Sequence, residues 1–285
     1  MEGVNQTMVT GFIFVGLTEN PQLQLYLFLI FLGVYLVAVV GNLDMIILIL
    51  VSFQLHTSIY YLLNSMSFID GCQSTVITPK ILVNFVTQKN VIPYPDYVTQ
   101  LYFFCAFVVV ECHMLAAMAY DLDVPISNPL LYNVTMSCQV CFWTVVGIYC
   151  LSLLSATVYT VFLVRLLFCN ANIINHYFCD LFPLLEFSCS STFINEILFF
   201  YTFNIVLPDV TNLNSYIFII VSILHIQSTG GRSKAFSTYS SHILTVAVFY
   251  GSTAFMYLQP SSASSLGQSK FLSVFYTFVF PVLIP

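Results

Sequence analysis

The sequence predicts an all-α membrane protein, a bundle of seven transmembrane helices. Three observations lead to this fold class: 59% of the 285 residues are hydrophobic, only 6% are charged, and the apolar residues fall into long stretches. A soluble domain carries about 25% charged residues, so this chain has too few polar side chains to cover a surface in water. A transmembrane β-barrel would instead show alternating segments of about ten residues.

Composition and motifs exclude several classes of function. A nucleic-acid-binding protein carries a basic patch, whereas this chain has six basic and twelve acidic residues and a formal net charge of −6. The sequence has no pattern of an activated serine, a zinc protease or a phosphate-binding loop. It also has no internal repeat or matched pair of interrupted helices, which disfavours a transporter or channel. We therefore expect neither an enzyme nor a nucleic-acid partner.

The first four helices follow from the apolar stretches. A transmembrane helix needs about 20 mostly apolar residues to cross about 30 Å of hydrocarbon. Asp44 interrupts the first stretch, Asp70 lies in the second and Glu111 in the third, while the fourth carries no charge. Acids inside a membrane are costly and usually face a cavity or a partner. The four expected helices cover residues 25–51, 57–78, 97–120 and 138–163.

The last three helices are expected over residues 195–226, 236–258 and 271–285, after a long extracellular loop over 164–194. The fifth contains Pro208, and the sixth has His242 as its only titratable side chain apart from tyrosines. The seventh has fifteen residues, which as a helix span about 22 Å, less than the hydrocarbon thickness. We therefore expect either a helix that ends inside the bilayer or a truncated sequence.

The orientation depends on the polar tail of residues 1–24 and on the basic residues. Asn5 begins a glycosylation sequon, whose use requires an extracellular N-terminus, and no basic segment of a cleaved signal peptide precedes the first apolar run. With that orientation only Arg232 and Lys234 are cytoplasmic, against four basic residues outside. Positive residues normally gather inside. Either the orientation is reversed or the chain has lost cytoplasmic basic residues.

Three cysteines, Cys169, Cys179 and Cys189, are spaced ten residues apart in the loop between the fourth and fifth helices. An extracellular loop permits disulfide formation, and because three is odd, one of them pairs elsewhere or remains a thiol. The other six cysteines lie in or next to apolar segments, where a thiol is usually a small hydrophobic side chain.

Short motifs along the chain carry a family resemblance. They are Gly41-Asn42, LHTSIYYLL over 55–63, SFID over 67–70, MAYD over 118–121, KAFST over 234–238, SSH over 240–242 and FYG over 249–251. In this order and at this spacing they resemble the olfactory receptors, a family of rhodopsin-like G-protein-coupled receptors. The resemblance covers almost the whole chain. It implies one receptor domain over residues 1–285, multi-pass in the lipid bilayer of the plasma membrane, with an extracellular N-terminus.

The function implied by the resemblance is binding of small, mostly apolar odorants and signalling through a stimulatory heterotrimeric G protein of the olfactory type. In such receptors the odorant cradle lies between the third, fifth and sixth helices, and an apolar wall with a few polar groups suits such ligands. Ordinary helix packing is the alternative at each matching position. These positions are Phe104, Cys105, Val108, Val109 and Cys112 in the third helix, Tyr201, Thr202 and Ile205 in the fifth, and Tyr250, Thr253, Ala254 and Tyr257 in the sixth.

Asn42, Asp70 and Glu111 match a polar core that such receptors have at mid-depth. Two neighbouring carboxylates repel each other and raise a pKa unless a cation is present. The resemblance therefore implies either a bound sodium ion or a shared proton, and the alternative is a pair of protonated, hydrogen-bonded structural acids. No other cofactor or metal is expected.

The chain departs from the family where receptors contact the G protein. The arginine of the family's DRY motif is Leu122, between Asp121 and Asp123, and Lys234 is the basic residue at the matching end of the sixth helix. In such receptors that arginine reaches toward the G protein, and leucine has no hydrogen-bond donor. Pro125 lacks an N–H, so we expect it to end or kink the helix.

Other departures concern the cysteines and the C-terminus. Tyr97 aligns with the family's helix-three cysteine, so Cys179 loses its usual partner, whereas Cys169 and Cys189 still match the family's second loop disulfide. Ser58 replaces a proline, and the family's NPxxY motif and basic tail do not follow the seventh helix. The alternative function is therefore a degraded or truncated receptor that does not signal and is retained in the endoplasmic reticulum.

Overall fold

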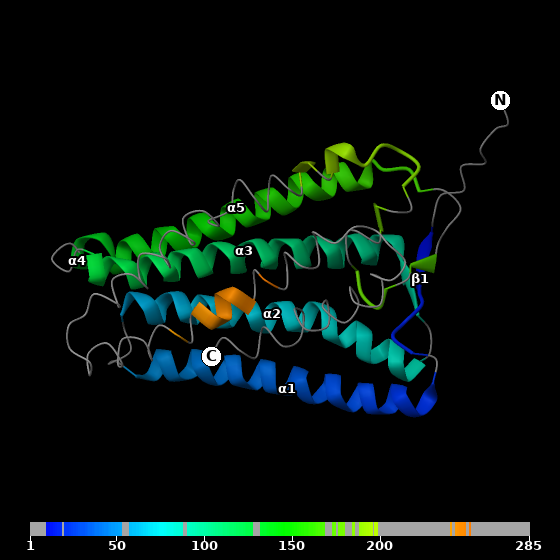
Figure 1. Ribbon diagram of the computed structural model, residues 1–285, viewed down its shortest axis with the longest axis horizontal. Coiled ribbons are helices and arrows are strands. Elements are labelled where there is room, and N and C mark those ends of the chain that lie inside the picture. The colour runs from blue at the N-terminus through cyan, green and yellow to red at the C-terminus, as the bar shows by residue number, and fades with distance from the viewer. Residues whose placement is uncertain are drawn as a thin grey trace.

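Four long helices run side by side in the computed structural model (Figure 1). They are α1 (Pro21–Val51), α2 (Ser58–Thr87), α3 (Tyr94–Ser127) and α5 (Cys138–Val164), and the four-residue α4 (Tyr132–Thr135) joins α3 to α5. Helix α1 packs on α2, α2 on α3, and α3 on α5. The structure describes residues 10–18, 20–52, 57–87, 90–127, 132–168, 173–174, 176–179, 184–185, 188–195, 197–198, 240, 243–248 and 251.

Local sequence sets the ends of these helices. Asn20 caps α1 by accepting a hydrogen bond from the Gln22 amide at 3.0 Å, and Pro21 occupies the first turn, where its missing N–H costs nothing. Ser137 caps α5 in the same way through the Val140 amide at 3.4 Å. Helix α2 extends beyond the expected end at residue 78 and contains Pro79, where the loss of a hydrogen bond explains its change of direction in Figure 1.

Pro125 does not end α3 as the sequence led us to expect. The described helix continues past it to Ser127. Proline removes one backbone hydrogen bond from a helix, and α3 accommodates this loss at Pro125.

Three of the described helices are long and apolar enough to cross a membrane: α1, α5 and α3 as far as Pro125. Much of their surface is apolar and exposed, as at Leu25 (60%), Val51 (71%) and Trp143 (62%). Exposed apolar area of this extent suits hydrocarbon rather than water. Helix α2 is more polar, because its buried side carries Asp70, Gln73 and several hydroxyl groups.

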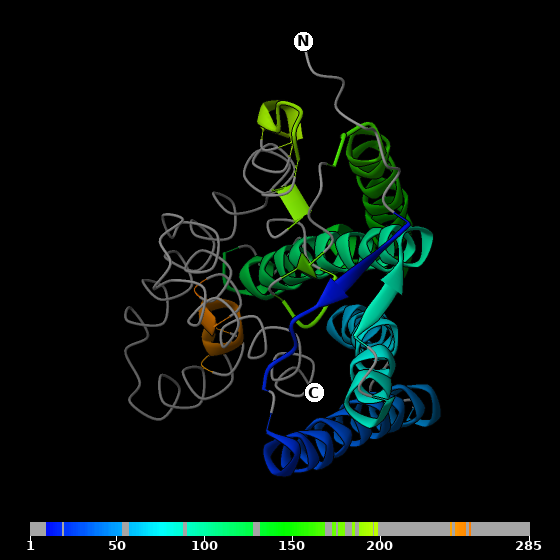
Figure 2. The same cartoon turned by 90° about the vertical axis from the view of Figure 1, so that its right-hand side faces the viewer.

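A small three-stranded sheet crosses one end of the bundle (Figure 2), a feature that the sequence analysis did not predict. Its central strand β1 (Gly11–Phe14) pairs antiparallel with β2 (Val91–Pro93) and parallel with β3 (Ile173–Ile174). The end of the bundle that carries this sheet is called the sheet end. The opposite end carries α4 and is called the α4 end.

Side chains of β1 anchor the sheet on α3. Phe12 is fully buried and Phe14 is 2% exposed, whereas Ile13 between them points outward, as strand geometry requires. Phe12 meets the Tyr97 ring edge-on at 5.1 Å, and Phe14 stacks on the same ring at 6.1 Å. The N-terminal segment is therefore part of the hydrophobic core.

Candidate functional site

The structure places Asp70 of α2 and Glu111 of α3 next to each other in the middle of the bundle. Both side chains are completely buried, and Gln73 lies beside Glu111 and is also completely buried. Asn42 of α1 is 1% exposed and donates from its amide nitrogen to the Ala38 carbonyl at 2.9 Å. Three helices thus bury polar side chains at the positions that the sequence analysis selected for a polar core.

The two carboxyl groups are close, but none of their four oxygens completes a hydrogen bond of good geometry. The same holds for the side-chain oxygens of Ser67 and Gln73. Two buried carboxylates side by side cost several kcal/mol, so a shared proton or a cation would stabilise this arrangement. Two acids with neutral oxygens around them form an oxygen-only donor set, which fits a hard cation such as sodium.

The described residues contain no cluster of three or more His, Cys, Asp or Glu side chains that could hold a metal ion. The polar core therefore differs from a zinc or iron site, which uses several imidazole, thiolate or carboxylate ligands. Two acids balance at most two positive charges, and neutral amide and hydroxyl oxygens would have to supply any further ligands.

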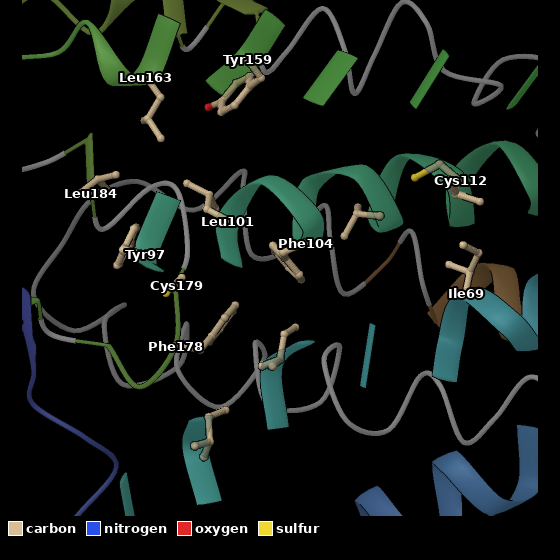
Figure 3. Close-up of a cluster of buried hydrophobic side chains, with 14 of the residues drawn as sticks. Ile69, Tyr97, Leu101, Phe104, Cys112, Tyr159, Leu163, Phe178, Cys179 and Leu184 are labelled. Atoms are coloured by element: carbon tan, nitrogen blue, oxygen red, sulfur yellow. The ribbon is translucent and has the colours of Figure 1, made fainter. Parts of the chain in front are cut away.

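The proposed odorant face of α3 lies in the described core. Phe104, Val108, Val109 and Cys112 are each at most 6% exposed, and Cys105 is half-buried beside them. Figure 3 shows Leu101, Phe104 and Cys112 at successive positions along α3. The remaining predicted cradle positions lie outside the described residues: Tyr201, Thr202, Ile205, Tyr250, Thr253, Ala254 and Tyr257.

The loop after α5 supplies aromatic side chains that the sequence analysis did not select. Phe178 is 2% exposed and meets Phe104 edge-on at 5.6 Å, and both are visible in Figure 3. His176 stacks on Tyr177 at 4.8 Å and meets Phe178 at 4.7 Å. The run of three rings directly before Cys179 is the sequence signal that could have identified them.

Cys179 remains a thiol and is 1% exposed. Its Sγ donates a hydrogen bond to Oε1 of Gln100 at 2.9 Å. Gln100 lies one turn after Tyr97, the residue that replaces the family's cysteine, and Figure 3 shows Tyr97 beside Cys179. Cys189 is disulfide-bonded, and its expected partner Cys169 lies outside the described residues, as does the sequon residue Asn5.

A hydrogen-bonded chain joins three helices at the α4 end. The Tyr132 hydroxyl lies 2.7 Å from Oγ of Ser58 and donates to Oδ1 of Asp121 at 3.4 Å. Asp121 is 3% exposed and Ser58 is 6% exposed. Burial raises the pKa of Tyr132, and the negative charge of Asp121 adds to the rise, so the phenol stays protonated as a donor. Ser58 and Tyr132 were not predicted for this site.

The other coupling positions have different surroundings. Leu122 is partly buried and packs against the hydrophobic core, so it presents no polar group at the position where the family has an arginine. Asp123 on the next position is half-buried. Lys234 lies outside the described residues.

Comparison with known proteins identifies the family. A sequence model of the family described as olfactory receptor matches residues 31–285. Olfactory receptor 8G2 of Homo sapiens is 62% identical over 287 residues, which cover 100% of this chain and 94% of that protein. Olfactory receptor 8G50 of Mus musculus is 62% identical over 283 residues, or 99% of this chain and 91% of that protein. The chain belongs to the olfactory receptor family, and it is therefore a helical membrane receptor and not an enzyme.

Proposed function

We propose that this chain binds small, mostly apolar odorants in a cradle between the third, fifth and sixth helices. The observation that carries the proposal is the buried face of α3 from Phe104 to Cys112, whose first residue, Phe104, meets Phe178 of the loop after α5 edge-on. Aromatic and aliphatic walls with a thiol and few polar groups suit a ligand that is recognised mainly by shape. The sheet end, where this face begins, is then the extracellular end.

Signalling follows from a shift between two conformations. An odorant that binds one state more tightly increases the population of that state, and the active state exposes a surface for a stimulatory G protein at the α4 end. Asp121, Leu122, Asp123 and Lys234 belong to that surface. The chain of Ser58, Tyr132 and Asp121 holds this end together in the state described here.

The polar core supports the same proposal. A sodium ion held by Asp70 and Glu111, with neutral oxygens of Asn42, Ser67 and Gln73, would stabilise one conformation of the bundle. An odorant that prefers the other conformation would then bind less tightly when sodium is bound. By linkage, sodium would bind less tightly when that odorant is bound. The alternative for the core is a pair of protonated acids that stabilise the fold without an ion.

A second candidate function is a receptor that reaches a membrane but does not signal. Leu122 favours it, because a partly buried apolar side chain packs against the core at the position where the family has an arginine. Tyr97 favours it as well, because its ring replaces one cysteine of a disulfide and leaves Cys179 as a thiol.

One experiment separates the two functions. The 285-residue chain, Leu122→Arg and Leu122→Ala are expressed in a reporter cell, their surface level is measured by labelling, and cAMP is recorded with an odorant panel. The proposal predicts odorant-evoked cAMP from the unchanged chain, an increase of about tenfold for Leu122→Arg, and no increase for Leu122→Ala. Surface expression without cAMP in the unchanged chain would establish the second candidate.

A further inference from the structure

We propose that a pocket at the sheet end is a second binding site, for a small neutral molecule with one ring or short chain and one hydrogen-bonding group. The pocket has a volume of about 170 Å³. It shares no residue with the proposed odorant cradle, so this inference does not depend on the proposed function. Its walls come from the segment after β1, the start of α1, the sheet end of α2 and the loop after β3. The lining residues are Phe14, Gly16, Leu17, Thr18, Pro21, Gln24, Ile81, Asn84, Phe85, Asn90 and Tyr177.

The chemistry of the lining selects a neutral ligand. Thr18, Gln24, Asn84 and Asn90 contribute a hydroxyl and three amide groups, and none of the lining side chains is charged. A charged ligand would lose its hydration without gaining an opposite charge. A molecule with one hydroxyl, carbonyl or amide group replaces its hydrogen bonds to water with hydrogen bonds to the polar side chains of the pocket, at little cost in free energy.

The apolar part of the lining sets the shape of the ligand. The rings of Phe14, Phe85 and Tyr177 and the aliphatic side chains of Leu17 and Ile81 complete the wall. Phe14 is 2% exposed and Tyr177 is 3% exposed, so both are held by the core. An apolar cavity of roughly 150 Å³ accepts benzene in another protein. A volume of about 170 Å³ therefore accepts one ring with a small polar substituent.

Hydrogen bonds to backbone carbonyl groups hold the walls in place without a ligand. The Phe14 amide donates to the Asn90 carbonyl at 2.7 Å, and Nε2 of Gln24 donates to the Thr18 carbonyl at 2.9 Å. Gly16 has φ +76°, and a Cβ there would lie 3.4 Å from Nδ2 of Asn90. Glycine adopts this conformation without strain, whereas most other residues rarely do, and a side chain at this position would narrow the pocket. A site formed before binding loses less entropy when the ligand arrives.

The test measures protection of a thiol at the pocket. Thr18→Cys is made in the full chain and reconstituted in lipid nanodiscs, and its alkylation by a maleimide is followed by peptide mass spectrometry. Benzyl alcohol is the neutral probe, benzoate the charged one and toluene the probe without a hydroxyl. Cys138, which is exposed at the α4 end, reports on the same molecules whether a probe slows alkylation everywhere.

We expect benzyl alcohol to slow alkylation of Thr18→Cys at least fivefold, toluene to slow it less, and benzoate to leave it unchanged, with no effect at Cys138. Adding Asn84→Leu removes a pocket amide and should abolish the protection, whereas Val83→Leu on the exposed side of the same turn should keep it. The proposal fails if benzyl alcohol gives no protection, if Cys138 is slowed equally, or if Asn84→Leu retains full protection. The alkylation rate depends on no odorant response and on no G protein. A failure of the pocket proposal can therefore be distinguished from a failure of the proposed function.

Discussion

Tyr97 shows how one substitution redirects a local structure. Its ring is fully buried between Phe12 and Phe14 of β1, so it supports the sheet in place of a covalent bond. Cys179 forms a hydrogen bond with Gln100 where the family has a disulfide. The sequence predicted the lost disulfide from Tyr97 alone, but it could not predict this hydrogen bond, because Gln100 and Cys179 are 79 positions apart.

Tyr97→Cys should restore a disulfide with Cys179. The new cysteine lies one turn before Gln100, which Cys179 already contacts at 2.9 Å. A disulfide contributes about 2–4 kcal/mol, which offsets most of the roughly 3–5 kcal/mol lost with a buried aromatic side chain. Mass spectrometry without reduction detects the bond, and thermal unfolding compares this variant with Tyr97→Ser. Equal unfolding temperatures of the two variants under oxidising conditions would contradict the prediction.

Asp70 and Glu111 give a second prediction at the residue scale. If they hold sodium, the ion stabilises the receptor by about 1.4 kcal/mol at tenfold its dissociation constant. Asp70→Asn or Glu111→Gln should therefore remove the difference in unfolding temperature between sodium and choline buffers. Asp44→Asn is the matched control, because Asp44 is also an acid in a spanning helix but lies exposed on α1. A wild-type chain that unfolds at the same temperature in both buffers would favour protonated acids without an ion.

At the scale of elements, the α4 end depends on side chains from three helices. Ser58 begins α2, Asp121 lies near the end of α3, and Tyr132 begins α4. Ser58 was identified only as a departure from a family proline, and Tyr132 was not selected at all. Their roles depend on how close the helix ends are, which hydrophobic periodicity does not specify.

Tyr132→Phe should loosen the α4 end. It leaves the buried Asp121 without its phenol donor, at a cost of about 1–3 kcal/mol. We expect faster hydrogen exchange over residues 132–135 and a smaller effect from Ser58→Ala. Tyr120→Phe is the matched control, since Tyr120 is 48% exposed on α3. Unchanged exchange in Tyr132→Phe would show that the hydrogen bonds contribute nothing to this end.

The pH dependence of this contact follows from the raised pKa of Tyr132. In the unfolded chain the phenol loses its proton near pH 10, whereas burial keeps it protonated at higher pH in the folded protein. The unfolded state thus binds fewer protons above that pH, so stability falls as the pH rises further. Protection factors from hydrogen exchange, measured between pH 7 and 9, should show no loss of protection at this contact.

At the scale of the whole molecule, the sequence predicted the helical membrane class but not the sheet. Long apolar stretches are strong signals, and a family resemblance arranged them as a receptor. Strands of four, three and two residues leave almost no pattern in a sequence. Their pairing joins segments far apart in the chain, so only the assembled bundle brings them together.

Phe12→Ala tests the contribution of the sheet to the molecule. Loss of a fully buried aromatic ring costs roughly 3–5 kcal/mol. We expect faster hydrogen exchange in β1, β2 and β3 and unchanged exchange in α4. Ile13→Ala is the control, because Ile13 is 38% exposed on the other face of the same strand. Equal effects of the two variants would mean that the sheet is not anchored by Phe12.

The central place of β1 has a consequence for biosynthesis. Both of its neighbours, β2 and β3, are translated after it, and β3 follows it by about 160 residues at Ile173–Ile174. Both edges of β1 are unpaired until β2 has been made, and the edge that pairs with β3 stays unpaired until the loop after α5 has been made. An unpaired strand edge promotes aggregation, so we expect this edge to need protection during synthesis.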